Sequence, residues 1–277
     1  MQERSFGACG SVVVVGQGTW QLEEASRAGV VRTLRAGLDA GMTHVDTAEL
    51  YGRGVVEEMV GEALAGRRDE VFLVSKVLPE NASRAGTIAA CERSLRRLRT
   101  ERLDVYLLHW RGRHPLAETV AAFDRLVAEG KIAAWGVSNF DEDDLAEVAA
   151  LGTPACNQVL YHLEERAIEH AVLPWCRAHE VAMVGYSPFG SGAFPSPRSA
   201  GGRVLQTVAD AHGVSPFQVA LAFLVREPGT FTIPRASSVA HAQENAAAGD
   251  LRLTAGEIAR IDAAFPRGRR RRGVPTL

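Results

Sequence analysis

Polar side chains stand at the ends of several short apolar runs along the chain. Asp46, Lys76 and His109 each occur at the end of one such run, and Tyr51 follows Asp46 by five residues. Together they supply a carboxylate, an ammonium, an imidazole and a phenol. These are groups that can hold a proton or transfer it to a reacting oxygen.

The apolar runs that carry these side chains are short and rich in β-branched residues or leucine, which is typical of strands. Eight such runs occur, at residues 12–15, 43–45, 71–74, 103–108, 132–137, 156–160, 181–186 and 230–233. Stretches with helical periodicity lie between them, among them 25–40, 55–65, 87–98, 116–129 and 141–149. Because the strand runs are almost wholly apolar, we expect a parallel sheet that is covered by helices.

This alternation predicts either a doubly wound sheet or a (β/α)8 barrel. The carboxyl ends of all barrel strands meet on one face, where the loops build active sites, so the polar strand ends favour the barrel. We therefore predict an α/β fold with one domain over residues 1–277. It is a single (β/α)8 TIM barrel with a short N-terminal β-hairpin around Val12 and a short C-terminal tail. The basic run at 267–272 is expected to be a solvated part of that tail.

Composition excludes several classes of protein. The net charge is −2, with 31 Lys and Arg against 33 Asp and Glu, which gives no electrostatic reason to expect nucleic acid or an anionic membrane as a partner. No apolar run approaches the roughly 18 residues of a membrane helix, and no signal-peptide pattern is present. The four cysteines are far apart and are expected to be reduced. These features predict a cytoplasmic protein, and a monomer is the default expectation for a barrel that builds its site from one chain.

Three other motifs are incomplete. Residues 16–18 resemble the opening of a dinucleotide-binding fingerprint, but no helix begins there. Ser187 follows a strand as a nucleophilic serine would, but Phe189 stands where that motif requires glycine. His44 and Asp46 could share a strand face as metal ligands, but no third ligand has a suitable spacing. We predict no metal site.

Eight short strings spread over nearly the whole chain resemble motifs of the aldo-keto reductase family. They are Gly18-Thr19-Trp20, Asp46-Thr47-Ala48-Glu49-Leu50-Tyr51-Gly52, Ser75-Lys76-Val77, Leu107-Leu108-His109-Trp110, Trp135-Gly136-Val137-Ser138-Asn139-Phe140, Asn157-Gln158-Val159, Tyr186-Ser187-Pro188 and Ile233-Pro234-Arg235. Within the family, the stretches 108–113 and 157–164 are similar to bacterial members of the methylglyoxal-reductase type.

The resemblance implies a reductase that converts small aldehydes, ketoaldehydes or ketones to alcohols by hydride transfer. The family's four catalytic positions fall on Asp46, Tyr51, Lys76 and His109. Tyr51 would act as the general acid. A neighbouring cation favours phenolate, so Lys76 is expected to lower the pKa of Tyr51. Asp46 would pair with Lys76, and His109 would orient the substrate oxygen.

The resemblance also implies NADP(H) as the cofactor, bound without a Rossmann domain, with NAD(H) as the less favoured alternative. Tyr186 would stack on the nicotinamide. The other expected cofactor contacts are Gly18, Thr19, Trp20, Asp46, Ser138, Asn139 and Gln158 near the nicotinamide, Ser187, Phe189 and Ser191 at the pyrophosphate, and Arg235, Ala236, His241, Glu244 and Asn245 at the adenosine. The permanent cation of Arg235 suits a 2′-phosphate.

The substrate is expected to be a small carbonyl compound. The residues expected to line its pocket are Trp20, Tyr51, His109, Trp110 and Phe140. Aromatic walls suit a small apolar or dicarbonyl molecule. Arg111 and Arg113 are interpreted as solvated loop charges, and the short region after Pro266 is expected to leave the pocket open.

Two other functions remain open. The barrel could be a non-catalytic subunit that binds a nicotinamide nucleotide and regulates a partner, although the four intact catalytic positions argue against this. Alternatively, Lys76 could form a Schiff base in a lyase or isomerase, with His109 as a proton shuttle.

Overall fold

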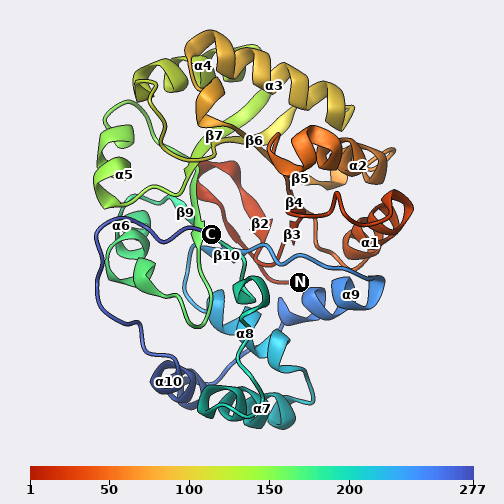
Figure 1. Ribbon diagram of the computed structural model, residues 1–277, viewed down its shortest axis with the longest axis vertical. Helices are drawn as coiled ribbons and strands as arrows, with labels where there is room; N and C mark the ends of the chain where they lie inside the picture. Colours follow the sequence, from red (N-terminus) through yellow and green to blue (C-terminus); the bar gives the residue numbers. More distant parts are fainter.

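The computed structural model describes residues 1–277, and its centre is a barrel of eight parallel strands (Figure 1). Neighbouring strands follow chain order around the barrel: β3 (Gln17–Gly18), β4 (His44–Asp46), β5 (Phe72–Val77), β6 (Leu103–Leu108), β7 (Ile132–Ser138), β8 (Cys156–Leu160), β9 (Ala182–Tyr186) and β10 (Thr230–Thr232). Short parallel bridges join Val15 to Thr232 and Gly18 to Arg235, which closes the barrel between its first and last strands. The predicted (β/α)8 barrel is confirmed.

Helices surround the barrel, one after each strand in the chain. They are α1 (Arg27–Asp39), α2 (Val55–Ala63), α3 (Arg84–Leu98), α4 (Leu116–Ala128), α5 (Glu142–Ala149), α6 (Val172–Ala178), α8 (Pro216–Leu224) and α9 (Val239–Ala248). Two further helices, α7 (Ala200–His212) and α10 (Ala255–Ala264), pack together outside this ring (Figure 1). None of the helices combines the length and the apolar character that would be needed to span a bilayer.

Local sequence signals set several of the helix ends. The Asp141 side chain caps α5 by accepting hydrogen bonds from the backbone N–H groups of Asp143 and Asp144. Gly41 and Gly130 lie just beyond α1 and α4 with φ of +89° and +70°, a conformation that glycine adopts without steric cost. These are the positions at which the sequence predicts that the two helices stop.

A hairpin covers the amino end of the barrel. β1 (Glu3–Ser5) pairs antiparallel with β2 (Ser11–Val13), so the hairpin predicted around Val12 is confirmed. The apolar run at 12–15 is not one strand, because Val12 and Val13 pair within the hairpin and the first barrel strand is β3. Phe6, in the hairpin turn, is fully buried.

His44 lies beneath the hairpin, and its side chain is fully buried. The centroid of its ring is 5.8 Å from that of Phe6 and 5.5 Å from that of Phe72, and both rings meet it edge-on. Neither ring nitrogen has a hydrogen-bond partner. Burial, together with the positive charge of Lys76, lowers the pKa of His44 to about 3, so the imidazole is neutral in the folded barrel at neutral pH.

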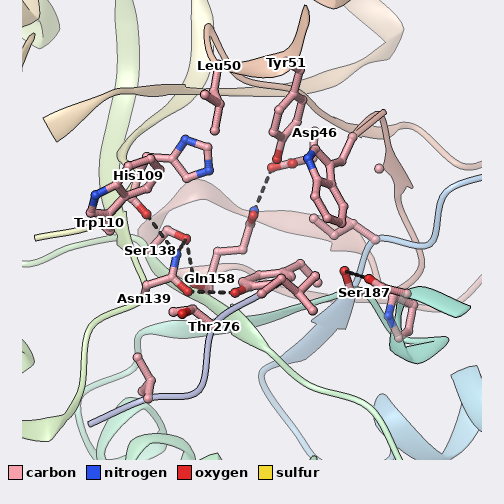
Figure 2. A pocket seen from close by; sticks show the side chains of 18 of the residues that line it. Asp46, Leu50, Tyr51, His109, Trp110, Ser138, Asn139, Gln158, Ser187 and Thr276 are labelled. Atoms are coloured by element: carbon pink, nitrogen blue, oxygen red, sulfur yellow. Dashed lines mark hydrogen bonds between the residues drawn. The ribbon is translucent and has the colours of Figure 1, made fainter. Parts of the chain in front are cut away.

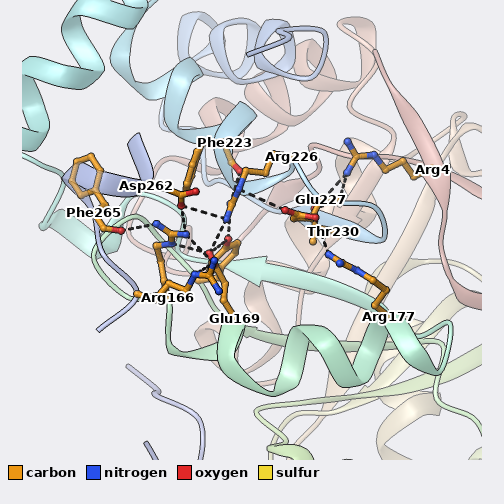
Figure 3. Close-up of polar contacts among 12 residues, drawn as sticks. Arg4, Arg166, Glu169, Arg177, Phe223, Arg226, Glu227, Thr230, Asp262 and Phe265 are labelled. Carbon is orange, nitrogen blue, oxygen red and sulfur yellow. Dashed lines mark hydrogen bonds and ion pairs between the residues drawn. The ribbon is translucent and has the colours of Figure 1, made fainter. Parts of the chain in front are cut away.

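An ionic network joins the C-terminal helix to the barrel wall (Figure 3). Arg166, only 1% exposed, donates to the two Glu169 oxygens at 2.7 and 2.8 Å and to Asp262 of α10 at 2.5 Å. Arg226 also donates to Glu169, at 3.1 Å, and its guanidinium lies 3.9 Å from the centroid of the Phe223 ring. Burial alone would raise the pKa of Glu169, but the hydrogen bond from Arg166 and the charge of Arg226 contribute to a net fall to about 2.

His44 makes stability depend on pH. Because an unfolded histidine has a pKa of about 6.5, protonation below that pH favours the unfolded chain. This group should therefore remove up to about 1.4 kcal/mol of stability for each pH unit between about 6.5 and the folded-state pKa of about 3. Urea unfolding of the wild type and His44→Leu at pH 8, 6 and 4.5 measures the effect. The variant should lose stability less steeply, and equal slopes would contradict the assignment.

Removing one partner from the Arg166 network leaves the Glu169 carboxylate buried with fewer donors. Arg166→Met is therefore expected to lower the free energy of unfolding by about 3 kcal/mol. Arg125→Met is the matched control, because Arg125 pairs with Glu129 at 2.7 Å on the exposed surface. The control should lose less than about 1 kcal/mol in denaturant unfolding. Losses of equal size would show that burial of the network contributes nothing.

Candidate active site

The carboxyl ends of the barrel strands open onto a cavity of about 870 Å³. Most of the residues predicted for the site line it, from both the catalytic and the cofactor sets. They are Gly18, Thr19, Trp20, Asp46, Tyr51, His109, Trp110, Ser138, Asn139, Gln158, Tyr186, Ser187, Phe189, Ser191 and Arg235. The residues at the predicted strand ends are far apart in the chain, and the fold brings them to one mouth of the barrel.

Lys76 does not itself line the cavity; it is fully buried behind the lining and donates three hydrogen bonds, two of them to the lining residues Asp46 and Tyr51. Its ammonium is 2.5 Å from Asp46 Oδ1, 2.9 Å from the Thr47 carbonyl oxygen and 3.2 Å from the Tyr51 hydroxyl oxygen. Gln158 donates to the other Asp46 oxygen at 2.7 Å. An ammonium has three donors and no acceptor, so the Tyr51 oxygen must accept from Lys76. The O–H of Tyr51 remains free to donate to another group.

The electrostatics of the site keep Lys76 charged. Burial alone would lower its pKa, but the Asp46 carboxylate and the Tyr51 oxygen together raise it above the ordinary value. Burial raises the pKa of Tyr51, and the charge of Lys76 opposes this rise only in part. Lys76 thus acts to lower the pKa of Tyr51, as expected, but removal of the phenol from water outweighs the nearby cation, and the net shift is upward. Tyr51 holds its proton firmly at neutral pH.

His109 lies beside Tyr51 on the same wall of the cavity. Figure 2 shows its ring between Trp110 and Tyr51, with centroid distances of 4.8 and 6.0 Å to those two rings. Burial and the positive charge of Lys76 lower the pKa of His109 well below its ordinary value, so its imidazole is neutral. A neutral imidazole donates one hydrogen bond and accepts one, which suits it to orient a polar substrate atom.

A chain of polar side chains forms another wall of the cavity (Figure 2). The Tyr186 hydroxyl donates to Asn139 Oδ1 at 2.9 Å, and Asn139 Nδ2 donates to Ser138 Oγ at 3.1 Å.

Ser187 and Ser191, which also line the cavity, both have φ of +51°, and their hydroxyls are 3.2 Å apart. Loops with such left-handed residues turn backbone N–H groups towards bound anions. Arg235 is exposed at this end of the cavity and donates to the Gln21 carbonyl oxygen at 3.2 Å.

Some predicted residues are not brought to the cavity. Phe140 is fully buried and does not line the cavity, so its expected place in the substrate pocket is wrong. Its backbone N–H and carbonyl are both bound by the Asn157 amide, at 3.4 and 2.9 Å, which turns the chain inward after β7. Four residues that are predicted to contact the adenosine do not line the cavity: Ala236, His241, Glu244 and Asn245. They lie on α9 or just before it.

The C-terminal tail forms a part of the cavity that the sequence does not predict. The chain runs from α10 past α6 and ends near the centre of the ring (Figure 1), where Val274, Thr276 and Leu277 line the cavity. The expectation that the region after Pro266 contributes little is therefore wrong.

The basic run at 267–272 forms ion pairs along the course of this tail. Arg267 pairs with Glu169 at 3.2 Å, Arg271 pairs with Glu165 at 3.2 Å, and Arg270 pairs with a carboxylate of α5. The run is exposed, as expected of a solvated tail, and three of its arginines also pair with carboxylates far away in the chain. Nothing in the local sequence signals these contacts, because their partners are about 100 or more residues away in the chain.

Comparison with known proteins gives a consistent result. The sequence model of the Aldo/keto reductase family matches residues 14–265. Methylglyoxal reductase YeaE of Escherichia coli is 46% identical over 96% of each chain, and glyoxal reductase of Bacillus subtilis is 32% identical over 90% of this chain and 87% of its own. A crystal structure of an aldo/keto reductase from Klebsiella pneumoniae in complex with NADP and acetate is 43% identical over 99% of each chain, with a TM-score of 0.93. The chain belongs to the aldo/keto reductase family.

Proposed function

We propose that this protein is an NADP(H)-dependent reductase of small aldehydes and ketoaldehydes, in which Tyr51 is the general acid. The observation that carries the proposal is the contact between Lys76 and Tyr51. Because all three ammonium protons are engaged, the Tyr51 oxygen accepts from Lys76, and its own proton is available in the cavity. The similarity to methylglyoxal and glyoxal reductases supports small dicarbonyl compounds as substrates.

The residues around the cavity fit a nicotinamide dinucleotide. Tyr186 offers an aromatic face, and the amides of Asn139 and Gln158 offer donors and acceptors for a carboxamide. The left-handed loop at Ser187 and Ser191 suits a pyrophosphate. When bound, the cofactor supplies the hydride that reaches the carbonyl carbon. A dinucleotide-bound relative, the Klebsiella pneumoniae enzyme crystallised with NADPH, is 43% identical over the full length of both chains.

In this reaction the protein's side chains donate one proton and stabilise one developing negative charge. Tyr51 gives its proton to the carbonyl oxygen as that oxygen gains negative charge. The Lys76 ammonium then stabilises the phenolate, and Asp46 keeps the ammonium in position. His109, being neutral, orients the carbonyl oxygen with a hydrogen bond and does not compete as an acid.

The same contacts speak against the two alternative functions. A Schiff-base mechanism needs a neutral amine, whereas Lys76 is a buried ammonium whose pKa is raised. We therefore expect no borohydride trapping of a carbonyl compound on Lys76. A purely regulatory nucleotide-binding role would not require the Lys76–Tyr51 contact.

Tyr51→Phe removes the transferable proton and keeps the ring. Reduction of methylglyoxal should fall at least about a hundredfold in kcat, because general acid catalysis contributes on that scale. Binding of NADPH, followed by quenching of protein fluorescence, should change little. Tyr106→Phe is the matched control, because the Tyr106 hydroxyl is buried without a partner and lies outside the cavity lining. Turnover by Tyr51→Phe at the control's rate would rule Tyr51 out as the acid.

Arg235 is proposed to hold the 2′-phosphate that distinguishes NADPH from NADH. Loss of a hydrogen-bonded charge pair corresponds to about 10- to 100-fold in affinity. Arg235→Ala should therefore raise the Kd for NADPH by that factor and change the Kd for NADH less than about twofold, as measured by fluorescence titration. Arg235→Lys, which keeps the charge, should recover most of the loss. Parallel weakening of both nucleotides by Arg235→Ala would mean that the phosphate is bound elsewhere.

A further inference from the structure

The substrate end of the cavity contains charged side chains that the proposed reaction does not use. Arg111 follows Trp110, which Figure 2 shows on the side of the cavity away from Ser187. Asp141 and Asp144, at the start of α5, line the cavity with it. This is the end at which a carbonyl substrate would enter, because the loop at Ser187 is proposed to hold the cofactor.

Arg111 is paired with two carboxylates. Its Nη1 and Nη2 donate to the two oxygens of Glu147 at 2.8 and 2.9 Å, and Nη1 also lies 3.3 Å from Asp144 Oδ1. The Nη edge of the guanidinium thus faces carboxylates, and of its five N–H donors only the Nε–H and one on Nη2 are left without a partner. The two carboxylates carry more negative charge than one guanidinium can neutralise, and Asp141 adds a further negative charge at the same rim.

No other side chain that lines the reacting end of the cavity is a cation. Lys76 is buried with all three donors used, and His109 is neutral. Arg235 lies at the end of the cavity that the cofactor is proposed to fill. Among the charged side chains that line the substrate mouth and their ion-pair partners, carboxylates therefore outnumber cations, which disfavours the approach of an anion.

We propose that Arg111, Asp144 and Glu147 form a charge filter that disfavours carbonyl compounds bearing a carboxylate or phosphate and favours neutral or cationic ones. The inference rests on the proposed reductase function and adds the substrate class to it. Arg111 is held as part of the filter and is not an anion-binding residue. Its interpretation as a solvated loop charge is therefore replaced by a role at the cavity rim.

The test uses three aldehydes with the same reacting group: benzaldehyde, 4-carboxybenzaldehyde and 4-(trimethylammonio)benzaldehyde. For each enzyme variant, kcat/KM with NADPH is measured and divided by the value for benzaldehyde, and comparing variants cancels the electronic effects of the ring substituents. The double variant Asp144→Asn, Glu147→Gln frees Arg111. Its carboxylate ratio should rise about three- to tenfold over the wild type, and its cationic ratio should fall by a similar factor.

Two controls separate the filter from general charge effects. Glu129→Gln removes a carboxylate that is paired with Arg125 and Lys131 far from the cavity lining, and its ratios should match the wild type. In the wild type, 0.5 M NaCl should reduce the preference against 4-carboxybenzaldehyde, because salt screens exposed charges. Unchanged ratios in the double variant, with benzaldehyde still reduced, would overturn the filter alone. If the wild type reduced none of the three aldehydes, the reductase proposal and the filter would both be overturned.

Discussion

The buried contact of Lys76 with Asp46 and Tyr51 is the interaction on which the rest of the site depends. An ammonium and a carboxylate taken out of water cost several kcal/mol each unless geometry and further hydrogen bonds compensate. Here Gln158 satisfies the second carboxylate oxygen and the Thr47 carbonyl satisfies a second ammonium proton. The third ammonium proton goes to Tyr51. The hydrogen bonds that compensate for burial of the ion pair also leave the Tyr51 O–H free to donate.

Sheet register explains why this contact forms. Asp46 of β4 is paired with Val74 of β5, and Lys76 lies two residues further along β5. Because side chains alternate along a strand, Lys76 and Val74 point to the same side of the sheet, which brings the ammonium beside the carboxylate. The two ends of the barrel also differ in polarity. The amino end packs His44 and Phe6 in an apolar plug, and the carboxyl end carries the polar groups.

Much of the fold and of the candidate site could be predicted from the sequence because both depend on short-range patterns. Apolar strand runs that end in polar residues predict which side chains share a barrel mouth, and Asp46, Lys76 and His109 are examples. The predictions are wrong where long-range contacts or a single backbone turn determine the position of a residue. Phe140 follows Asn139, whose φ of +61° redirects the chain into the core. The tail that lines the cavity pairs its arginines with carboxylates that are distant in the chain, and no local pattern predicts such contacts.

The most direct measurement is the position of a carbonyl oxygen in a crystal structure of the protein with oxidised cofactor and a carbonyl-bearing inhibitor. Its oxygen should lie within hydrogen-bond reach, roughly 2.6–3.2 Å, of the Tyr51 hydroxyl while Lys76 still donates to that hydroxyl. A carbonyl oxygen bound by other groups, with the Tyr51 hydroxyl turned away from it or separated from Lys76, would contradict the role of the buried ion pair.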